Sequence, residues 1–323
     1  MMKLAAPPSI VVLDGHTLNP DGDNPWDEIA ALGSLTVHPR TPSAEIVARA
    51  ADADIILTNK TPLAAATLAT LPRLRFVSVL ATGHNIVDSA AARARGVPVA
   101  NVPTYGTATV AQHTFALILE LCHNAGLHSR SVHDGEWSAS PDFCYWKKPL
   151  VELEGLTFGI VGRGRIGRRV ADIAAAFGMR VRFASANEPE GREGELVPLE
   201  TLLAEADILS LHCALTPSSI RFINAVTLSR MKPGAFLINT GRGALIDEPA
   251  LRAALDSGHL GGAALDVLDG EPPSATHPLP GAPNCIITPH MAWSSLRARR
   301  RLMQITAANI RAFLAGKPEN SVN

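Results

Sequence analysis

The chain has 323 residues, of which 46% are hydrophobic and 18% are charged. This composition predicts a folded protein of about two domains and excludes a disordered chain. Lys and Arg together number 29, Asp and Glu number 30, and the net charge is −1. The chain therefore lacks the basic surplus typical of nucleic-acid-binding proteins.

Nothing in the sequence predicts a membrane span, a leader or a bound metal. No uncharged apolar run approaches the ~18 residues of a membrane helix, since the best run, 115–119, stops at Glu120. Pro7, Pro8 and Asp14 interrupt the N-terminus, and no cleavage-like site follows. The four cysteines are widely spaced without a CxxC pair, so neither a disulfide framework nor a zinc site is indicated. We expect a cytoplasmic protein with reduced thiols.

The first part of the chain alternates β-branched runs with Ala/Leu-rich segments. Strands are predicted at 9–13, 54–58, 75–79 and 97–100, and helices at 43–51 and 62–71. Strands that alternate with helices indicate βαβ units, which form a parallel sheet with helices on both faces.

A long helix is predicted from about 107 to 127, and periodicity is lost over 129–150. This second segment concentrates aromatic residues, namely Trp137, Phe143, Tyr145 and Trp146. Two interpretations stay open: an arm packed over the chain's own core, or an arm that contacts a second subunit.

A second alternating block begins near Leu156. Strands are predicted at 157–161, 179–184, 207–212, 235–240, 262–267 and 285–288, and helices at 165–177 and 294–315. Gly178 is placed as the stop of the first of these helices. The predicted architecture is two α/β blocks in one chain.

A glycine-rich turn follows the first strand of this block. Gly162-Arg163-Gly164-Arg165-Ile166-Gly167 fits G-x-G-x-x-G and opens a helix, which is the context that makes the motif informative. The glycines permit a tight turn, close approach of a pyrophosphate and close helix–strand packing. The helix N-terminus adds N–H groups and partial positive charge. The motif predicts a bound dinucleotide, NAD or NADP.

The choice between these two cofactors depends on the end of the next strand. An acid there binds the ribose 2′-hydroxyl of NAD. Ser185 holds that position, and Arg163, Arg182 and Arg192 are nearby in the sequence. Without a carboxylate to repel a 2′-phosphate, the sequence favours NADP slightly.

Three further motifs each follow a predicted strand. They are Asn239-Thr-Gly-Arg242-Gly243, then Leu265-Asp266-Val-Leu-Asp-Gly-Glu271-Pro272, then Thr288-Pro-His290-Met-Ala-Trp293. Ligands of open α/β sheets bind beyond the carboxyl ends of the strands. An Arg, a Glu and a His are therefore expected at one edge of the sheet.

With these motifs in family order, the chain resembles the D-2-hydroxyacid dehydrogenases, nearest to glycerate dehydrogenase and hydroxypyruvate reductase-like members. The resemblance implies two doubly wound parallel-sheet domains, a Rossmann cofactor domain and a flavodoxin-like substrate domain. We expect the substrate domain at 1–103 and 292–323 and the cofactor domain at 104–291. The resemblance also implies a homodimer, built through a helix and arm at 107–150.

The resemblance assigns catalysis to Arg242, Glu271 and His290, and the chemistry suits these residue types. Reducing a small 2-keto acid, best hydroxypyruvate or glyoxylate, to a D-2-hydroxy acid needs a hydride at carbon and a proton at oxygen. An imidazole, with a reference pKa near ~6.5, can carry that proton at neutral pH. A neighbouring carboxylate stabilises the imidazolium. A guanidinium offers a planar fork to carboxylate and keto oxygens.

Further site residues follow from the resemblance or from position. Asp266 is expected to bind the nicotinamide amide, and Ala81, Thr82 and Gly83 the substrate carboxylate. Lys60 follows a strand and is either a cleft residue or a solvated lysine, and Trp293 is either a pocket wall or core. Thr109, Thr216 and Thr240 are additional cofactor-contact candidates. His123 and His128 are five residues apart and do not share a helix face well, so no metal site is predicted.

A function of another class is also compatible with this fold. A nucleotide-sensing co-repressor would keep the fold for protein binding. The intact Arg–Glu–His set favours the enzyme.

Overall fold

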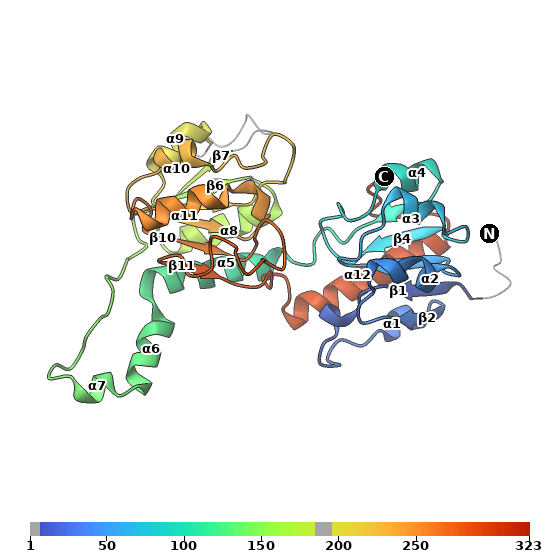
Figure 1. Ribbon diagram of the computed structural model, residues 1–323, viewed down its shortest axis with the longest axis horizontal. Helices are drawn as coiled ribbons and strands as arrows, with labels where there is room; N and C mark the ends of the chain where they lie inside the picture. The colour runs from blue at the N-terminus through green and yellow to red at the C-terminus, as the bar shows by residue number, and fades with distance from the viewer. Residues whose placement is uncertain (1–6, 185–195) are drawn as a thin grey trace. The chain divides into compact units, whose positions relative to one another are not determined.

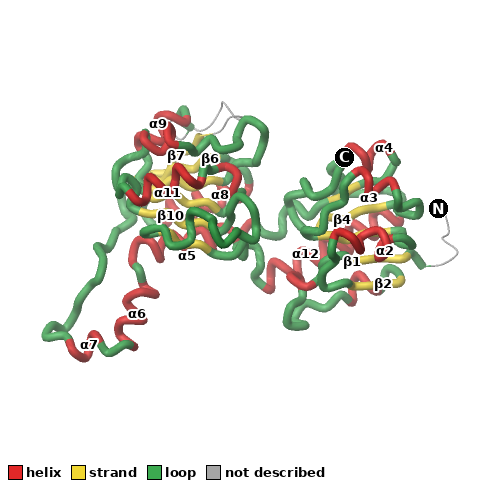
Figure 2. Tube along the Cα trace, in the orientation of Figure 1, coloured by secondary structure: helices red, strands yellow, loops and turns green. Residues whose placement is uncertain are grey.

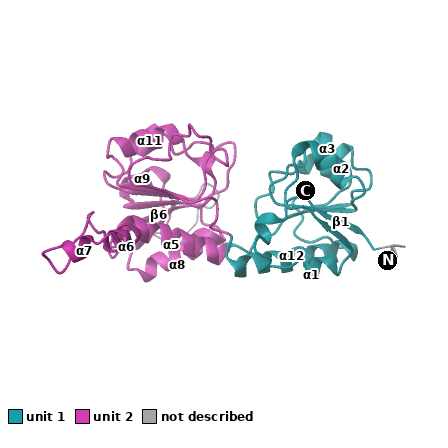
Figure 3. Ribbon diagram, turned by 60° about the horizontal axis from the view of Figure 1, so that its bottom comes forward, with its two compact units in different colours: residues 1–106, 294–323 teal, residues 107–293 magenta. Residues whose placement is uncertain are grey.

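The computed structural model describes residues 7–184 and 196–323, which form two compact units (Figure 1). Unit 1 comprises residues 1–106 and 294–323, and unit 2 comprises residues 107–293 (Figure 3). The sequence predicts the divisions after residues 103 and 291. In the structure they fall after Gly106 and Trp293.

Unit 1 is built on a five-stranded parallel sheet of order β2-β1-β3-β4-β5. This is the flavodoxin-like order, as expected. β3 and β4 lie inside the sheet and are buried along their whole length, which fits their mainly apolar sequences. The strands are β1 (Ser9–Val12), β2 (Ser34–Val37), β3 (Ile55–Thr58), β4 (Phe76–Val79) and β5 (Val99–Ala100).

Helices cover both faces of this sheet, as Figure 3 shows. On one face lie α2 (Ile46–Ala50), α3 (Ala65–Ala69) and α4 (Ser89–Ala94); on the other lie α1 (Asp27–Ala30) and α12 (Leu296–Leu314). α12 packs on β4, where the rings of Phe313 and Phe76 stack with centroids 4.6 Å apart. The buried Arg299 of α12 holds the Asp23 carboxylate through two hydrogen bonds of 2.7 Å. These contacts explain why the last segment of the chain belongs to unit 1.

Unit 2 is built on a six-stranded parallel sheet of order β11-β10-β9-β8-β6-β7 (Figure 2). Its strands are β6 (Thr157–Val161), β7 (Arg180–Ala184), β8 (Ile208–Leu211), β9 (Phe236–Asn239), β10 (Gly262–Leu265) and β11 (Cys285–Ile287). The strand order reverses between β6 and β8, so the turn after β6 lies at a topological switch point. The prediction of two doubly wound parallel-sheet domains is confirmed.

Two apolar layers sandwich the second sheet. The helices α5 (Thr107–His123) and α8 (Arg165–Ala176) pack together on one face, where Phe115, Phe158 and Ile160 are buried. α9 (Leu199–Glu205), α10 (Ala225–Ser229) and α11 (Glu248–Asp256) cover the opposite face, around Leu209 and Leu237. Burial on both faces holds the strand ends that carry the predicted site in fixed positions.

The single helix predicted over 107–127 is wrong. α5 ends at His123, and Asn124 adopts the left-handed conformation, with φ 48°, before α6 (Ala125–His133) begins. Asn tolerates this conformation better than most residues, and the Glu120 carboxylate accepts from the Gly126 N–H at 3.2 Å. The segment predicted to be irregular from 129 therefore begins inside α6 and includes α7 (Glu136–Ala139).

Candidate functional site

Three neighbouring strands of unit 2 end at the same edge of their sheet. β9 ends at Asn239, β10 at Leu265 and β11 at Ile287. Because the strands are parallel, the segments that follow them gather at this edge. These segments carry Arg242, Asp266 to Glu271, and His290.

Glu271 and His290 form a close pair. The Nδ1 atom of His290 lies 2.6 Å from Oε2 of Glu271. The other carboxylate oxygen of Glu271 accepts from the Leu268 N–H at 3.0 Å. The two side chains are only partly buried, with exposed fractions of 25% for His290 and 32% for Glu271. With Nδ1 turned to the carboxylate, Nε2 is the ring atom that can serve another molecule.

The backbone at His290 is held in an unusual conformation. Its φ is 51°, in the left-handed region that costs energy for a residue other than glycine. The His290 N–H donates to the Asp266 carbonyl at 2.8 Å and to the Thr288 carbonyl at 2.9 Å. The surrounding contacts thus determine where the ring points.

Asp266 anchors the segment around His290. Its side chain is 1% exposed. Its Oδ1 accepts from Thr288 Oγ1 at 2.6 Å and from the Met291 N–H at 2.9 Å, and its Oδ2 accepts from the Ala292 N–H at 2.9 Å. Burial opposes the charge, but these hydrogen bonds and one from His113 outweigh it and keep the pKa of Asp266 below its usual value.

His113 is a member of this network that the sequence did not single out. Its Nε2 lies 3.1 Å from Thr288 Oγ1 and 3.5 Å from Asp266 Oδ1. The Oδ2 atom of Asp266 accepts from the Ala292 N–H, and a carboxylate oxygen can accept a second bond. Asp266 can therefore fix the segment around His290 and still accept a hydrogen bond from the amide of a bound molecule.

Arg242 lies directly after β9. Its Nη1 donates to the Gly241 carbonyl at 2.8 Å, and its own carbonyl accepts from Asn239 Nδ2, also at 2.8 Å. The residue is half-buried. Gly243 follows in tight contact with the Glu271 segment, because a Cβ there would lie 1.9 Å from the carbonyl carbon of Leu268. This close approach ties the arginine and glutamate segments together.

The glycine turn after β6 fits a pyrophosphate. Gly162 has φ 104°, and a Cβ on it would lie 2.6 Å from the backbone of His212 and Cys213. A Cβ on Gly167 would lie 2.1 Å from the Gly162 carbonyl oxygen. A Cβ on Gly164 would meet no atom of the described residues within 4 Å beyond its chain neighbours and its own helix, and Gly164 directly precedes α8 as a cap without a side chain. The turn therefore leaves open space in front of a helix N-terminus.

The other predicted cofactor residues have different surroundings. Ser185 and Arg192 lie outside the described residues, so the structure gives no geometry for them. The Thr240 hydroxyl is buried 3.1 Å from that of Thr114, which directs it into the core. Thr216 is exposed in a turn, and Thr109 is half-buried on α5. Arg163, Arg165 and Ile166 lie in or directly after the glycine turn.

The predicted substrate residues of unit 1 lie in loops after β3 and β4. The Asp14 carboxylate accepts from the backbone N–H groups of Asn59 and Thr61 at 2.7 Å and of Lys60 at 2.5 Å. This fixes the loop backbone, and the Lys60 side chain is exposed. Thr82 is also exposed, and its hydroxyl donates to the Val102 carbonyl at 2.9 Å.

The remaining predicted site residues are partly buried. Ala81 and Gly83 flank Thr82 in the loop after β4, and both are half-buried. Trp293 is half-buried at the last position of unit 2. Among residues 7–184 and 196–323, no cluster of three or more His, Cys, Asp or Glu side chains could hold a metal ion.

Comparison with known proteins gives a family match over more than half of the chain. Residues 115–292 match the model described as D-isomer specific 2-hydroxyacid dehydrogenase, NAD binding domain. The chain belongs to this family. It is an oxidoreductase that uses NAD or NADP, and the resemblance inferred from the motifs is confirmed.

Several individual proteins are similar to this dehydrogenase over most of their length. It is 46% identical to a hydroxypyruvate reductase of Blautia hydrogenotrophica, over 97% of this chain and 99% of that protein. It is 42% identical to a glycerate dehydrogenase of Methylorubrum extorquens, over 86% of this chain and 88% of that protein. An NADPH-dependent glyoxylate/hydroxypyruvate reductase of Sinorhizobium meliloti, solved with NADP and malonate, superposes with a TM-score of 0.86. The two sequences are 28% identical, and the match covers 98% of this chain and 97% of that structure's chain.

The described part of this dehydrogenase contains no helix both long and apolar enough to span a membrane.

We expect Gly243→Ala to destabilise unit 2 of this dehydrogenase. The new Cβ would meet backbone atoms of Leu268 and Asp269 at 1.9 to 2.3 Å, and backbone cannot yield as a flexible side chain can. Overpacking of this kind costs about 2–3 kcal/mol. The matched control is Gly258→Ala, where φ is 71° and the new Cβ would meet no atom of the described residues within 4 Å, so only a left-handed cost of about 1 kcal/mol applies. Thermal unfolding measures both; equal losses would contradict the packing argument.

Proposed function

We propose that this protein reduces a small 2-keto acid to the D-2-hydroxy acid, with hydroxypyruvate or glyoxylate as substrate. The observation that carries the proposal is the Glu271–His290 pair, 2.6 Å apart, at the sheet edge that also carries Arg242. An acid–base imidazole and an anion-binding guanidinium are what this reduction needs from the protein. The similarity to a hydroxypyruvate reductase and a glycerate dehydrogenase supports the substrate class.

In this proposal the three catalytic side chains have different roles. Bound NADH or NADPH supplies the hydride. His290 donates the proton on Nε2 to the keto oxygen, and Glu271, at Nδ1, stabilises the imidazolium. Arg242 binds the substrate carboxylate and polarises the carbonyl as negative charge develops on its oxygen. Lys60, Ala81, Thr82, Gly83 and Trp293 are the proposed further substrate contacts.

The proposed cofactor site lies in unit 2. The proposed substrate contacts Lys60 and 81–83 lie in unit 1, which corresponds to the expected substrate domain. The pyrophosphate would be held by the glycine turn, which comprises Gly162, Arg163, Gly164, Arg165, Ile166 and Gly167. Asp266 would bind the nicotinamide amide. Thr109, Thr216 and Thr240 stay proposed contacts; with its hydroxyl turned to Thr114, Thr240 would act through its backbone.

We also propose a preference for NADP over NAD. The guanidinium of Arg163 lies over the ring of Phe183, 5.6 Å from its centroid. Phe183 is in β7, the strand that leads to Ser185. This places a positive charge beside the end of that strand, where Ser185 takes the position of the acid and a 2′-phosphate would be favoured.

The substrate assignment is tested by comparing kcat/KM for hydroxypyruvate, glyoxylate and pyruvate at saturating cofactor. We expect hydroxypyruvate or glyoxylate to be preferred. Preference for pyruvate would overturn the substrate assignment, and no turnover with any of the three would favour the co-repressor-like alternative.

Glu271→Gln should lower kcat for keto-acid reduction roughly tenfold at neutral pH. Reduction needs a protonated His290, and a neutral amide does not stabilise the imidazolium. The proton is then lost at lower pH, so the fall of rate on the alkaline side should move toward acid. The pH profile of kcat measures this shift, and an unchanged profile would remove the role given to Glu271.

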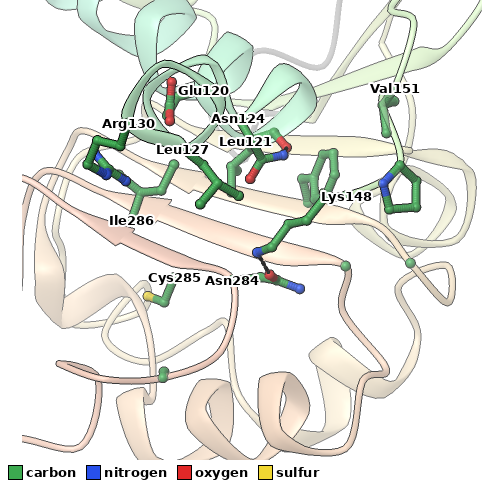
Figure 4. Close-up of a pocket in the computed structure, with 15 residues that line it drawn as sticks. Glu120, Leu121, Asn124, Leu127, Arg130, Lys148, Val151, Asn284, Cys285 and Ile286 are labelled. Atoms are coloured by element: carbon green, nitrogen blue, oxygen red, sulfur yellow. Dashed lines mark hydrogen bonds between the residues drawn. The ribbon is translucent and has the colours of Figure 1, made fainter. Parts of the chain in front are cut away.

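We propose a cytoplasmic homodimer built through the helix and arm at 107–150. Figure 1 shows the arm, residues 124–150 with α6 and α7, extending from α5. Phe143 is 89% exposed and Trp146 67% exposed, far more apolar surface than a solvated arm needs. A hollow of about 560 Å³ lies between the arm and the amino ends of β9, β10 and β11 (Figure 4). Within it, Lys148 Nζ donates a hydrogen bond to Asn284 Oδ1. A second copy would cover these surfaces, and light scattering would report the dimer mass.

A further inference from the structure

A buried carboxylate lies next to the segment that carries Glu271. Glu248 begins α11, and its side chain is 8% exposed. Its Oε1 accepts from the Asp269 N–H at 2.8 Å. The N–H of the preceding residue, Leu268, is bound by Glu271. Two consecutive N–H groups are thus taken by two carboxylates, one buried and one in the proposed active site.

His277 closes the other side of Glu248. Its Nε2 lies 2.8 Å from Glu248 Oε2, and its side chain is 7% exposed. The Leu279 N–H points at Nδ1 of the same ring at 3.3 Å. The bond from the Leu279 N–H orients the His277 ring. This orientation brings Nε2 close to the Glu248 carboxylate, although the contact lacks the geometry of a hydrogen bond.

The same peptide is held from a second direction by the arginine segment. Gly243 approaches the Leu268–Asp269 peptide so closely that no Cβ fits. Asp269 also pairs through its carboxylate with Arg221 at 3.3 Å, but both side chains are exposed, so this pair adds little. Glu248 is the buried polar contact that fixes this peptide. Burial raises the pKa of Glu248, which is the cost of placing a carboxylate there.

We propose that Glu248, which His277 contacts, is a positioning residue for the proposed reaction. It fixes the Leu268–Asp269 peptide and through it the adjoining Val267–Leu268 peptide, whose N–H orients the Glu271 carboxylate toward His290. The inference rests on the proposed function. A shift of the catalytic pair by about 1 Å costs up to a hundredfold in rate, so the effect should be measurable although neither residue touches the proposed substrate.

The test compares Glu248→Ala with Glu248→Gln and with Asp247→Ala. Alanine removes the acceptor for the Asp269 N–H, and glutamine keeps an amide oxygen for it. Asp247 caps the same helix by accepting from the Ala250 N–H at 3.1 Å, so Asp247→Ala weakens α11 without touching the Leu268–Asp269 peptide. For each variant, kcat, KM, the pH profile, the thermal midpoint and the Kd for NADPH are measured.

We expect Glu248→Ala to lower kcat for hydroxypyruvate about tenfold, with KM and the Kd for NADPH within about twofold of wild type. The alkaline fall of kcat should move toward acid, as in Glu271→Gln. Glu248→Gln should stay within about threefold of wild-type kcat. Asp247→Ala should lower the thermal midpoint but keep the wild-type pH profile.

Two outcomes would overturn the inference. One is a Glu248→Ala enzyme with wild-type kcat and pH profile; the other is Asp247→Ala and Glu248→Ala losing activity alike. Failure of the proposed function looks different, because the wild-type protein would then reduce none of the keto acids, whatever residue stands at 248.

Discussion

Arg242→Ala is expected to lower kcat/KM for hydroxypyruvate by about 10³-fold, which corresponds to about 4 kcal/mol of transition-state stabilisation. The side chain is proposed to bind the carboxylate and to polarise the carbonyl, so both kcat and KM should change. Arg242→Lys keeps the charge but loses the planar fork, and should recover only part of the loss.

The matched control is Arg230→Ala. Arg230 also pairs with a carboxylate, Glu200 at 2.7 Å, but it lies on the surface, where such a pair is worth little. This variant should keep wild-type kinetics. Steady-state rates, together with an unchanged Kd for NADPH, would separate lost chemistry from lost folding. A loss of less than tenfold in Arg242→Ala would contradict the role given to this residue.

Removing the imidazole of His290 is expected to lower kcat between about 10² and 10⁴-fold while KM changes little. Asn is the better replacement, because position 290 has φ 51° and Asn tolerates left-handed backbone where Ala is strained. His290→Asn should therefore keep the segment that Asp266 anchors, and His290→Ala should show the same kinetic loss with lower stability.

The pH profile tells this role from a structural one. Without His290, keto-acid reduction should lose the part of its pH dependence that comes from the general acid. His123, exposed at the end of α5, supplies the control, and His123→Ala should behave as wild type. Full activity in His290→Asn would show that another group supplies the proton.

The fold could be predicted from sequence where a local pattern marks an element. β6 is a mainly apolar run that is buried throughout, and its bounds match the prediction of 157–161. β2 was missed because it lies at the sheet edge and alternates exposed Ser34 and Thr36 with half-buried Leu35 and Val37, a weak signal. The break at Asn124 depends on a single backbone conformation within an otherwise helical pattern.

The candidate site also contains residues that local motifs predict and residues that only the folded structure brings together. Arg242, Glu271 and His290 stand in motifs that directly follow strands, so the sequence could place them at one edge. The Glu248–His277 contact joins residues far apart in the chain, and nothing local in the sequence links an acid at the start of one helix to a histidine in a later loop. His113 reaches the site only because α5 packs against this sheet.

The proposed function is tested most directly by the oxidation of NADH and NADPH with hydroxypyruvate, measured for both cofactors in parallel by absorbance, with chiral analysis of the product. We expect turnover that yields D-glycerate, with a higher kcat/KM for NADPH than for NADH. Formation of L-glycerate, or no oxidation of either cofactor with hydroxypyruvate or glyoxylate, would contradict it.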